Sequence, residues 1–236
     1  MYNKLGIIGG MGPLATVNLF KRIVFLTDAK KDQEHLEIII DNNTSIPDRT
    51  SYILGKGENP KNELIKSAKT LEKAGAEYLV MPCNTAHYFY NDIAKEINIP
   101  LLNMIEETTN HVIEYYRSKK IGLLSTEGTS KSGVYDKYFN KHHINLYKLD
   151  KEKQRYVSKF IYDIKEGCEE RSIYNFKNVL IELKKSDIEV LILGCTELST
   201  AYDIYGFRGN FIDPLDIIAK KAIEYSGKKI RQNKLN

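Results

Sequence analysis

An internal repeat constrains this chain more than any other feature of its sequence. Residues 78–83 form an apolar run that ends at Cys83, and residues 190–195 form a second one that ends at Cys195, 112 residues later. Small polar residues follow each cysteine. A short apolar run that stops at polar residues is typical of a buried strand and the loop after it. Two such copies predict two lobes of the same architecture.

The rest of the chain alternates between strand and helix patterns. Apolar runs predict further strands at residues 5–8, 37–40, 101–102, 120–124 and 145–149. Helical periodicity covers residues 14–24, 60–74, 84–97, 105–116, 154–165, 173–185 and 215–225. We expect loops at residues 125–129 and around residues 202–207. This alternation predicts an α/β fold with two pseudosymmetric, Rossmann-like lobes built on parallel sheets.

The predicted topology also places the site. Ligands of parallel sheets bind at the carboxyl ends of the strands, and both repeated cysteines stand at such ends. If a pseudo-twofold axis relates the lobes, Cys83 and Cys195 lie on opposite sides of one cleft. We therefore expect the active site in the cleft between the lobes.

Composition narrows the possible functions. The chain has 236 residues, 42% of them apolar and 28% charged, and a formal charge of +4. No run approaches the roughly 20 apolar residues of a membrane span, and no signal peptide is evident. The basic residues are scattered rather than set among aromatic side chains, which argues against nucleic-acid binding. We expect a soluble, cytosolic protein whose three cysteines stay as thiols.

A glycine-rich turn follows the first strand. Residues 10–15 fit the pattern G-x-G-x-x-A, and Asp41 ends the next predicted strand. Dinucleotide binding is therefore one hypothesis. The proline at position 13, and a matching turn at residues 125–129 that is not glycine-rich, fit a carboxylate-binding turn better. A close backbone turn without any ligand is the third interpretation.

The cysteines allow several kinds of chemistry. We interpret Cys168 as an inert, small apolar residue. Cys83 and Cys195 precede backbone and side-chain donors, and a helix N-terminus there would lower the pKa of each thiol. Cys83 and His87 have the spacing of metal ligands on a helix, but no clustered histidines support a zinc site. We expect His87 to cap a helix or to pack.

A pair of equivalent thiols favours one reaction class. A cysteine hydrolase needs a single nucleophile and an oriented base, which leaves the second cysteine unexplained. Racemisation uses two groups, because a proton leaves one face of a carbon and another arrives at the opposite face. Cationic groups must also neutralise the carboxylate of the substrate. Arg49 and Lys165 are candidates, although either could be a surface charge.

With these motifs in hand, the sequence resembles the cofactor-independent aspartate/glutamate racemase family, and its aspartate racemases in particular. The likeness covers nearly the whole chain. It is carried by GGMGP at residues 9–13, PDRT at residues 47–50, MPCNTAH at residues 81–87 and GCTEL at residues 194–198. The paired cysteine motifs make the resemblance specific.

The resemblance implies an enzyme that interconverts L- and D-aspartate without pyridoxal phosphate, and it suggests a homodimer; we expect no metal, because the spacing of cysteines and histidines does not support a site. Catalytic thiols are expected at Cys83 and Cys195. Arg49 and Lys165 would bind the two carboxylates of the substrate. The remaining substrate contacts would come from Met11, Asn84, Thr85, Thr126 and Thr196.

The resemblance also implies that the last helix returns to the first lobe. The first lobe would then hold residues 1–102 and 212–236, and the second lobe residues 103–211. Glutamate racemases carry aspartate, serine and glycine after the first strand, where residues 8–10 here read Ile-Gly-Gly. Aspartate is therefore the expected substrate. Glutamate or broad-specificity racemisation, a related cysteine-dependent isomerase or decarboxylase of a small dicarboxylate, and a non-catalytic binding protein are the alternatives.

Overall fold

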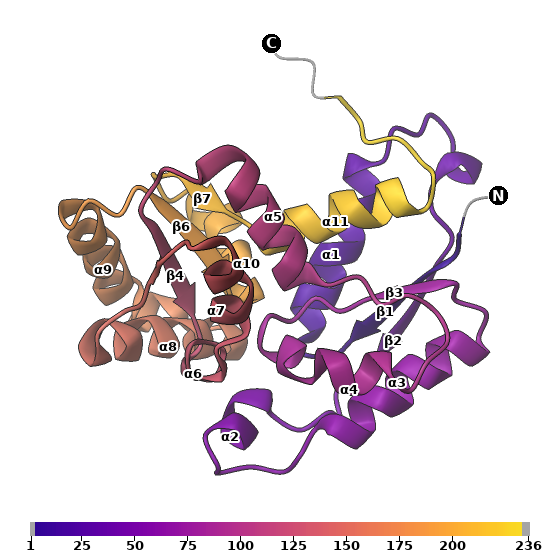
Figure 1. Cartoon of the computed structure of the whole chain (residues 1–236), viewed down its shortest axis with the longest axis horizontal. Coiled ribbons are helices and arrows are strands. Elements are labelled where there is room, and N and C mark those ends of the chain that lie inside the picture. The colour runs from indigo at the N-terminus through magenta and orange to yellow at the C-terminus, as the bar shows by residue number, and fades with distance from the viewer. Residues whose placement is uncertain (1–2, 233–236) are drawn as a thin grey trace.

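Two parallel β-sheets organise the computed structural model, which describes residues 3–232 (Figure 1). The first sheet has the strand order β2-β1-β3, with β1 at Leu5–Gly9, β2 at Ile38–Asn42 and β3 at Tyr78–Val80. The second sheet has the order β5-β4-β6-β7, with β4 at Ile121–Ser125, β5 at Leu146–Tyr147, β6 at Val190–Gly194 and β7 at Phe211–Ile212. The predicted α/β fold with two lobes is confirmed.

The two sheets repeat one another in detail. In each, the fully buried central strand, β1 or β4, pairs with the strand that precedes a repeated cysteine. Gly6 and Gly122 occupy the second position of these strands. A Cβ at Gly122 would lie 2.8 Å from Leu191, and one at Gly6 would clash with Leu79. Each glycine thus makes room for the leucine of the neighbouring strand, so the repeat in sequence is also a repeat in packing.

The helices cover the sheets and connect their strands. They are α1 (Pro13–Leu26), α2 (Arg49–Ile53), α3 (Lys61–Lys73), α4 (Tyr90–Ala94), α5 (Met104–Tyr116), α6 (Glu127–Ser132), α7 (Val134–Phe139), α8 (Lys151–Glu166), α9 (Ile173–Lys185), α10 (Thr196–Tyr205) and α11 (Pro214–Tyr225). None of the helices in the described part of the chain has the length and apolarity needed to cross a bilayer.

Several sequence-based expectations were wrong in local detail. The helix expected over residues 84–97 is a 3₁₀ turn, Thr85–Phe89, followed by the short α4. The loop expected at residues 125–129 starts α6, because the Thr126 side chain accepts a hydrogen bond from the Thr129 N–H and caps a helix. The loop expected around residues 202–207 is largely the end of α10, which stops at Gly206 in the left-handed conformation. Leu101 forms only an isolated bridge to Leu79 instead of a strand.

The last helix, α11, packs on the first sheet although it follows the second. Leu215, Ile218 and Ala222 are fully buried in one cluster with Leu5 and Tyr78. Figure 1 shows α11 beside α1 and α5. This packing favours the proposed division into residues 1–102 with 212–236 and residues 103–211. Ile212 itself pairs in the second sheet, and residues 1–2 and 233–236 lie outside the described part of the chain.

Ionic contacts fix α11 to its neighbours. Arg22 of α1 bonds to Asp213 at 2.7 Å, to Asp216 at 2.5 Å and to Asp203 of α10 at 2.8 Å. The Asp213 side chain also accepts hydrogen bonds from the Leu215 N–H and the Ser199 hydroxyl. One arginine therefore joins α1, α10 and the cap of α11. Such a shared network fixes the lobes more firmly than separate surface pairs would.

The lobes also meet directly where α6 packs on α2. A Cβ at Gly128 of α6 would lie 2.8 Å from the Cα of Thr50 and 2.7 Å from its hydroxyl oxygen. The Thr50 hydroxyl in turn donates to Thr126 at 3.3 Å. The absence of a side chain at Gly128 therefore allows the lobes to approach at this edge of the cleft.

We expect Gly128→Ala to destabilise the protein by about 1–3 kcal/mol, because the new methyl group must displace backbone atoms of the other lobe. Urea denaturation measures the change. Ser130→Ala, on the half-exposed side of the same helix, is the matched control and should change stability by less than about 0.5 kcal/mol. Equal effects of the two substitutions would contradict the close packing.

Candidate active site

A pocket between the lobes gathers the residues that the sequence analysis selected. The space between its atoms, including solvent at its mouth, is about 290 Å³. All nine predicted site residues line it, namely Met11, Arg49, Cys83, Asn84, Thr85, Thr126, Lys165, Cys195 and Thr196. Three further residues, Asp48, Thr50 and Glu197, complete the lining. The two thiols therefore share one pocket, as the repeat predicted.

Cys83 stands in the loop that leaves β3. Its side chain is buried, and its main-chain carbonyl bonds to Nδ1 of His87 at 2.8 Å. The other ring nitrogen, Nε2, accepts a hydrogen bond from the Met104 N–H at the start of α5. His87 is therefore neutral with its proton on Nδ1. The expected capping role is confirmed, and because both ring nitrogens are bonded, neither is directed at a metal with Cys83.

Burial controls the protonation of His87. Desolvation lowers its pKa to about 4, while the bond to Cys83 opposes the shift. An imidazolium would lose the hydrogen bond from Met104, because its Nε2 would then carry a proton. His87 therefore joins the Cys83 loop to the first turn of α5 only in its neutral form.

Cys195 stands at the equivalent position after β6. It is the N-cap residue of α10, and its thiol donates a hydrogen bond to Oε2 of Glu197 at 2.9 Å. Burial and the Glu197 carboxylate raise the pKa of Cys195 well above its usual value. The expected lowering by the helix N-terminus was wrong for this residue, because desolvation and the adjacent negative charge outweigh the helix dipole.

Lys165 and Glu197 form a partly buried ionic pair beside Cys195. Lys165 lies in the last turn of α8, and its Nζ lies 3.8 Å from Oε1 of Glu197. Burial opposes the charge of Lys165, but Glu197 and the two thiols raise its pKa overall. Lys165 therefore lines the pocket as a cation, although the residue as a whole is exposed.

Arg49 is held in place by backbone oxygens. Its terminal nitrogens donate to the carbonyls of Ile46, Pro47 and Met11 at 3.0–3.3 Å. The Nε atom is buried and has no partner among the described residues. The Asp48 side chain caps α2 by accepting a hydrogen bond from the Ser51 N–H. Burial alone would raise the pKa of Asp48, but the hydrogen bonds with Ser51 and the charges of Arg49 and Lys165 lower it overall. A buried donor without a partner marks a place for an acceptor from a ligand.

Asn84 presents a second donor of this kind. Its Oδ1 accepts a hydrogen bond from the Tyr135 hydroxyl at 2.6 Å, whereas its Nδ2 is buried without a partner among the described residues. Next to it, the Thr85 hydroxyl lies 3.2 Å from that of Thr126 and 2.7 Å from that of Thr129. These contacts join the first lobe to the second.

Sequence reasoning missed four polar residues that shape the pocket: Asp48, Thr50, Tyr135 and Glu197. Glu197 could have been found, because it follows Cys195 by two residues and belongs to the quoted motif GCTEL. Asp48 likewise precedes the selected Arg49. Tyr135 carries no local signal, because its role depends on how α7 packs against the Cys83 loop of the other lobe.

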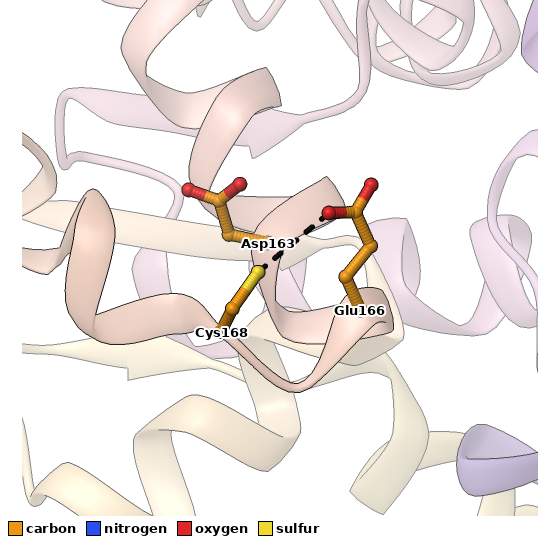
Figure 2. Close-up of side chains that lie close together, drawn as sticks. All are labelled: Asp163, Glu166 and Cys168. Carbon is orange, nitrogen blue, oxygen red and sulfur yellow. Dashed lines mark hydrogen bonds between the residues drawn. The ribbon is translucent and has the colours of Figure 1, made fainter.

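Cys168 lies outside this pocket. Its thiol, the exposed Glu166 and the buried Asp163 bring their ligand atoms within 4.8 Å of one another (Figure 2). Both carboxylate oxygens of Asp163 already accept hydrogen bonds from Lys159 at 3.0 Å. Among the described residues, the Cys168 thiol makes one long hydrogen-bond contact, 3.6 Å, to Glu166. We assign no role to this cluster.

Comparison with known proteins agrees with this geometry. A model of the Asp/Glu/Hydantoin racemase family matches residues 8–222. A solved aspartate racemase from Picrophilus torridus is similar over 97% of this chain and 96% of its own, with 31% identity and a TM-score of 0.85. The chain therefore belongs to the Asp/Glu/Hydantoin racemase family.

Two further relatives are racemases with other named specificities. A broad-specificity amino-acid racemase of Bacillus subtilis is 26% identical over 93% of this chain and 96% of its own length. A glutamate racemase of Aquifex pyrophilus is 33% identical, but over only 56% of this chain and 50% of its own. Membership of the family thus establishes a racemase relationship and leaves the amino acid open.

We expect His87 to make the stability of the protein depend on pH. The folded-state pKa is about 4, below the ordinary 6.5, so the unfolded chain binds a proton first as the pH falls. Stability is full above pH 6.5 and falls between pH 6.5 and 4, by about 3 kcal/mol in total. Urea denaturation at pH 7.0 and 4.5 should show a smaller loss for His87→Gln than for the wild type. His142→Gln is the control, and if both variants keep the wild-type pH dependence, this role of His87 is excluded.

Proposed function

We propose that the protein interconverts L- and D-aspartate by proton transfer between two thiols, without pyridoxal phosphate. The observation that carries the proposal is the presence of Cys83 and Cys195, at equivalent strand ends, in one pocket. A reaction that is nearly symmetric about one carbon needs two such groups. The similarity to the aspartate racemase of Picrophilus torridus over almost the full length of both chains supports the choice of substrate.

The polar groups of the pocket suit a small dicarboxylate. Arg49 and Asn84 both line the pocket, and each has a buried donor, Nε or Nδ2, without a partner among the described residues. Lys165 adds a cation on the side of Cys195 and Glu197. Arg49 and Lys165 would each bind one carboxylate, while Asn84, Thr85 and Thr196 hold the α-carboxylate and the amine. Met11 and Thr126 close the remaining walls.

Proton transfer then follows from the thiols. The Cys83 thiolate removes the α-proton, and the electron pair of the broken C–H bond spreads into the α-carboxylate, whose charge the pocket donors stabilise. The Cys195 thiol delivers its proton to the opposite face of the same carbon. One enantiomer has become the other, and the two sulfurs have exchanged their protonation states.

Glu197 makes the reverse direction possible. In that direction Cys195 must start as a thiolate, although burial and Glu197 raise its pKa. Glu197 already accepts the S–H hydrogen bond, so its Oε2 is placed to take the thiol proton. Lys165, 3.8 Å from the other carboxylate oxygen, offsets the negative charge of the pair. This role of Glu197 is part of the proposal.

Broad-specificity racemisation is the second candidate function. The relative from Bacillus subtilis, which matches nearly the whole chain, favours it. Glutamate is a less suitable substrate, because Ile8 and Gly9 stand where glutamate racemases have aspartate and serine. Parallel assays of aspartate, glutamate and uncharged amino acids distinguish the candidates.

In D₂O, we expect the wild-type protein to form D-aspartate from L-aspartate with deuterium at Cα. Cys83→Ala and Cys195→Ala should each reduce the rate by about 10²–10⁴-fold, because each removes one proton-transfer group. Chiral chromatography and mass spectrometry measure both results. Cys168→Ala, outside the pocket, should retain activity. Full activity of either pocket variant, or product that keeps its protium, would exclude the two-thiol mechanism.

We also propose that the protein is a cytosolic homodimer, in keeping with the resemblance that its sequence shows. Leu14, Val17, Phe20 and Phe25 expose apolar side chains on α1, and Ile40 is exposed on the edge strand β2. Apolar surface of this extent is typical of subunit interfaces. Nothing in the proposed reaction requires a nucleic acid or a membrane.

Light scattering after size-exclusion chromatography should give twice the mass of one chain. Val17→Glu should shift the protein toward the monomer, because it places a charge within the apolar surface of α1. Tyr174→Glu, at a more exposed apolar site on α9, should leave the mass unchanged. A monomeric wild-type protein would contradict the proposal.

A further inference from the structure

The amide of Asn84 can bind an anion in only one of its two orientations. An asparagine side chain ends in an acceptor, Oδ1, and a donor, Nδ2, which have almost the same shape. With Nδ2 free, the residue attracts a carboxylate. Turned by 180°, it would present Oδ1 to the same place and repel that carboxylate. A pocket that uses Asn84 for substrate binding must therefore fix the orientation of this amide.

The hydroxyl of Tyr135 supplies this orientation. It donates to Oδ1 of Asn84 at 2.6 Å, which leaves Nδ2 buried and without a partner among the described residues. Tyr135 is itself only 1% exposed, and burial raises its pKa, so the phenol stays protonated and remains a donor. Its ring packs in the core of the second lobe with Phe139 and Ile105.

The contact crosses between the lobes. Asn84 follows the Cys83 strand of the first lobe, whereas Tyr135 belongs to α7 in the proposed second lobe. Asn84 is therefore oriented only while the two lobes are together. His87, in the same 3₁₀ segment, is held separately by Met104 at the start of α5, so the backbone of the loop has its own support.

We propose that Tyr135 is a positioning residue that sets the amide of Asn84 for carboxylate binding and makes substrate affinity depend on the closed arrangement of the lobes. The inference rests on the proposed function, because it identifies the ligand group as a substrate carboxylate. Tyr135 acts through Asn84 and makes no contact with the reacting atoms in this scheme.

Tyr135→Phe removes the hydroxyl and keeps the ring. We expect the KM for L-aspartate to rise about tenfold, because an amide that is no longer oriented loses its hydrogen bond to the carboxylate. The kcat should change by less than about threefold, since both thiols are unaltered. In an Asn84→Ala background, Tyr135→Phe should add no further increase in KM. An unchanged KM, or additive effects in the double variant, would overturn the proposal.

A matched control separates orientation from general stability. Tyr78 is also fully buried and donates one hydrogen bond, to the Ala222 carbonyl at 2.7 Å, within the core of the first lobe. Tyr78→Phe should lower the melting temperature and leave the KM unchanged. A rise in KM equal to that of Tyr135→Phe would show that loss of a buried hydroxyl is sufficient, and would overturn the specific role of Tyr135.

Two further measurements use succinate in place of the substrate, and the second of them uses only wild-type protein. Calorimetry with succinate, a dicarboxylate without an amine, should show about tenfold weaker binding to Tyr135→Phe than to the wild type. In nitrogen-labelled wild-type protein, the side-chain amide resonance of Asn84 should shift on addition of succinate, and an unshifted resonance with succinate bound would overturn the inference. Absence of aspartate racemisation by the wild type would refute the proposed function, whereas the succinate data test Tyr135 by themselves.

Discussion

The pocket depends on two parallel sheets whose carboxyl ends face one another. Each central strand pairs with a strand that ends in a cysteine loop, and equivalent glycines, Gly6 and Gly122, allow the same leucine packing in both lobes. This repeated geometry brings two cysteines, one from each lobe, to one pocket. The contacts between the lobes then set the width of the cavity. Three contacts lie at this junction: the packing of Gly128 on Thr50, the contact between the hydroxyls of Thr85 and Thr126, and the hydrogen bond from Tyr135 to Asn84.

Electrostatics make the two halves unequal. Cys195 donates to a buried carboxylate that is paired with Lys165, and its pKa is raised. The carbonyl of Cys83 is instead bonded by a neutral histidine. A pseudosymmetric fold therefore holds two equivalent cysteines in unequal surroundings. In the proposed mechanism, Glu197 and Lys165 allow the Cys195 side to exchange roles with the Cys83 side.

Much of the fold could be predicted because its signals are local. Apolar runs located the central strands, and helical periodicity located the long helices, including α11 at the end of the chain. The short α6 and the 3₁₀ segment after Asn84 were missed, since a few residues carry little periodicity and side-chain caps decide their conformation. The packing of α11 on the first sheet came from resemblance, because nothing in the helix itself states which sheet it covers.

The candidate site, like the fold, could be predicted only in part from the sequence. Cys83 and Cys195 could be selected from the repeat, and Arg49 and Lys165 from the charge that the chemistry requires. The surroundings of these side chains could not be predicted, because they depend on burial and on contacts between the lobes. The pKa of Cys195 is the clearest example, since the helix N-terminus favours a thiolate while desolvation and Glu197 favour the thiol more strongly. Tyr135 is another, because its partner lies 51 residues away on the other lobe.

The central claim is that the two sulfurs act on opposite faces of one carbon. A crystal structure of the protein with bound aspartate tests it most directly. The account predicts that Cα lies between the two Sγ atoms, within about 3–4 Å of each, with the carboxylates on Arg49 and Lys165. Aspartate bound with only one thiol near Cα, or bound outside this pocket, would contradict it.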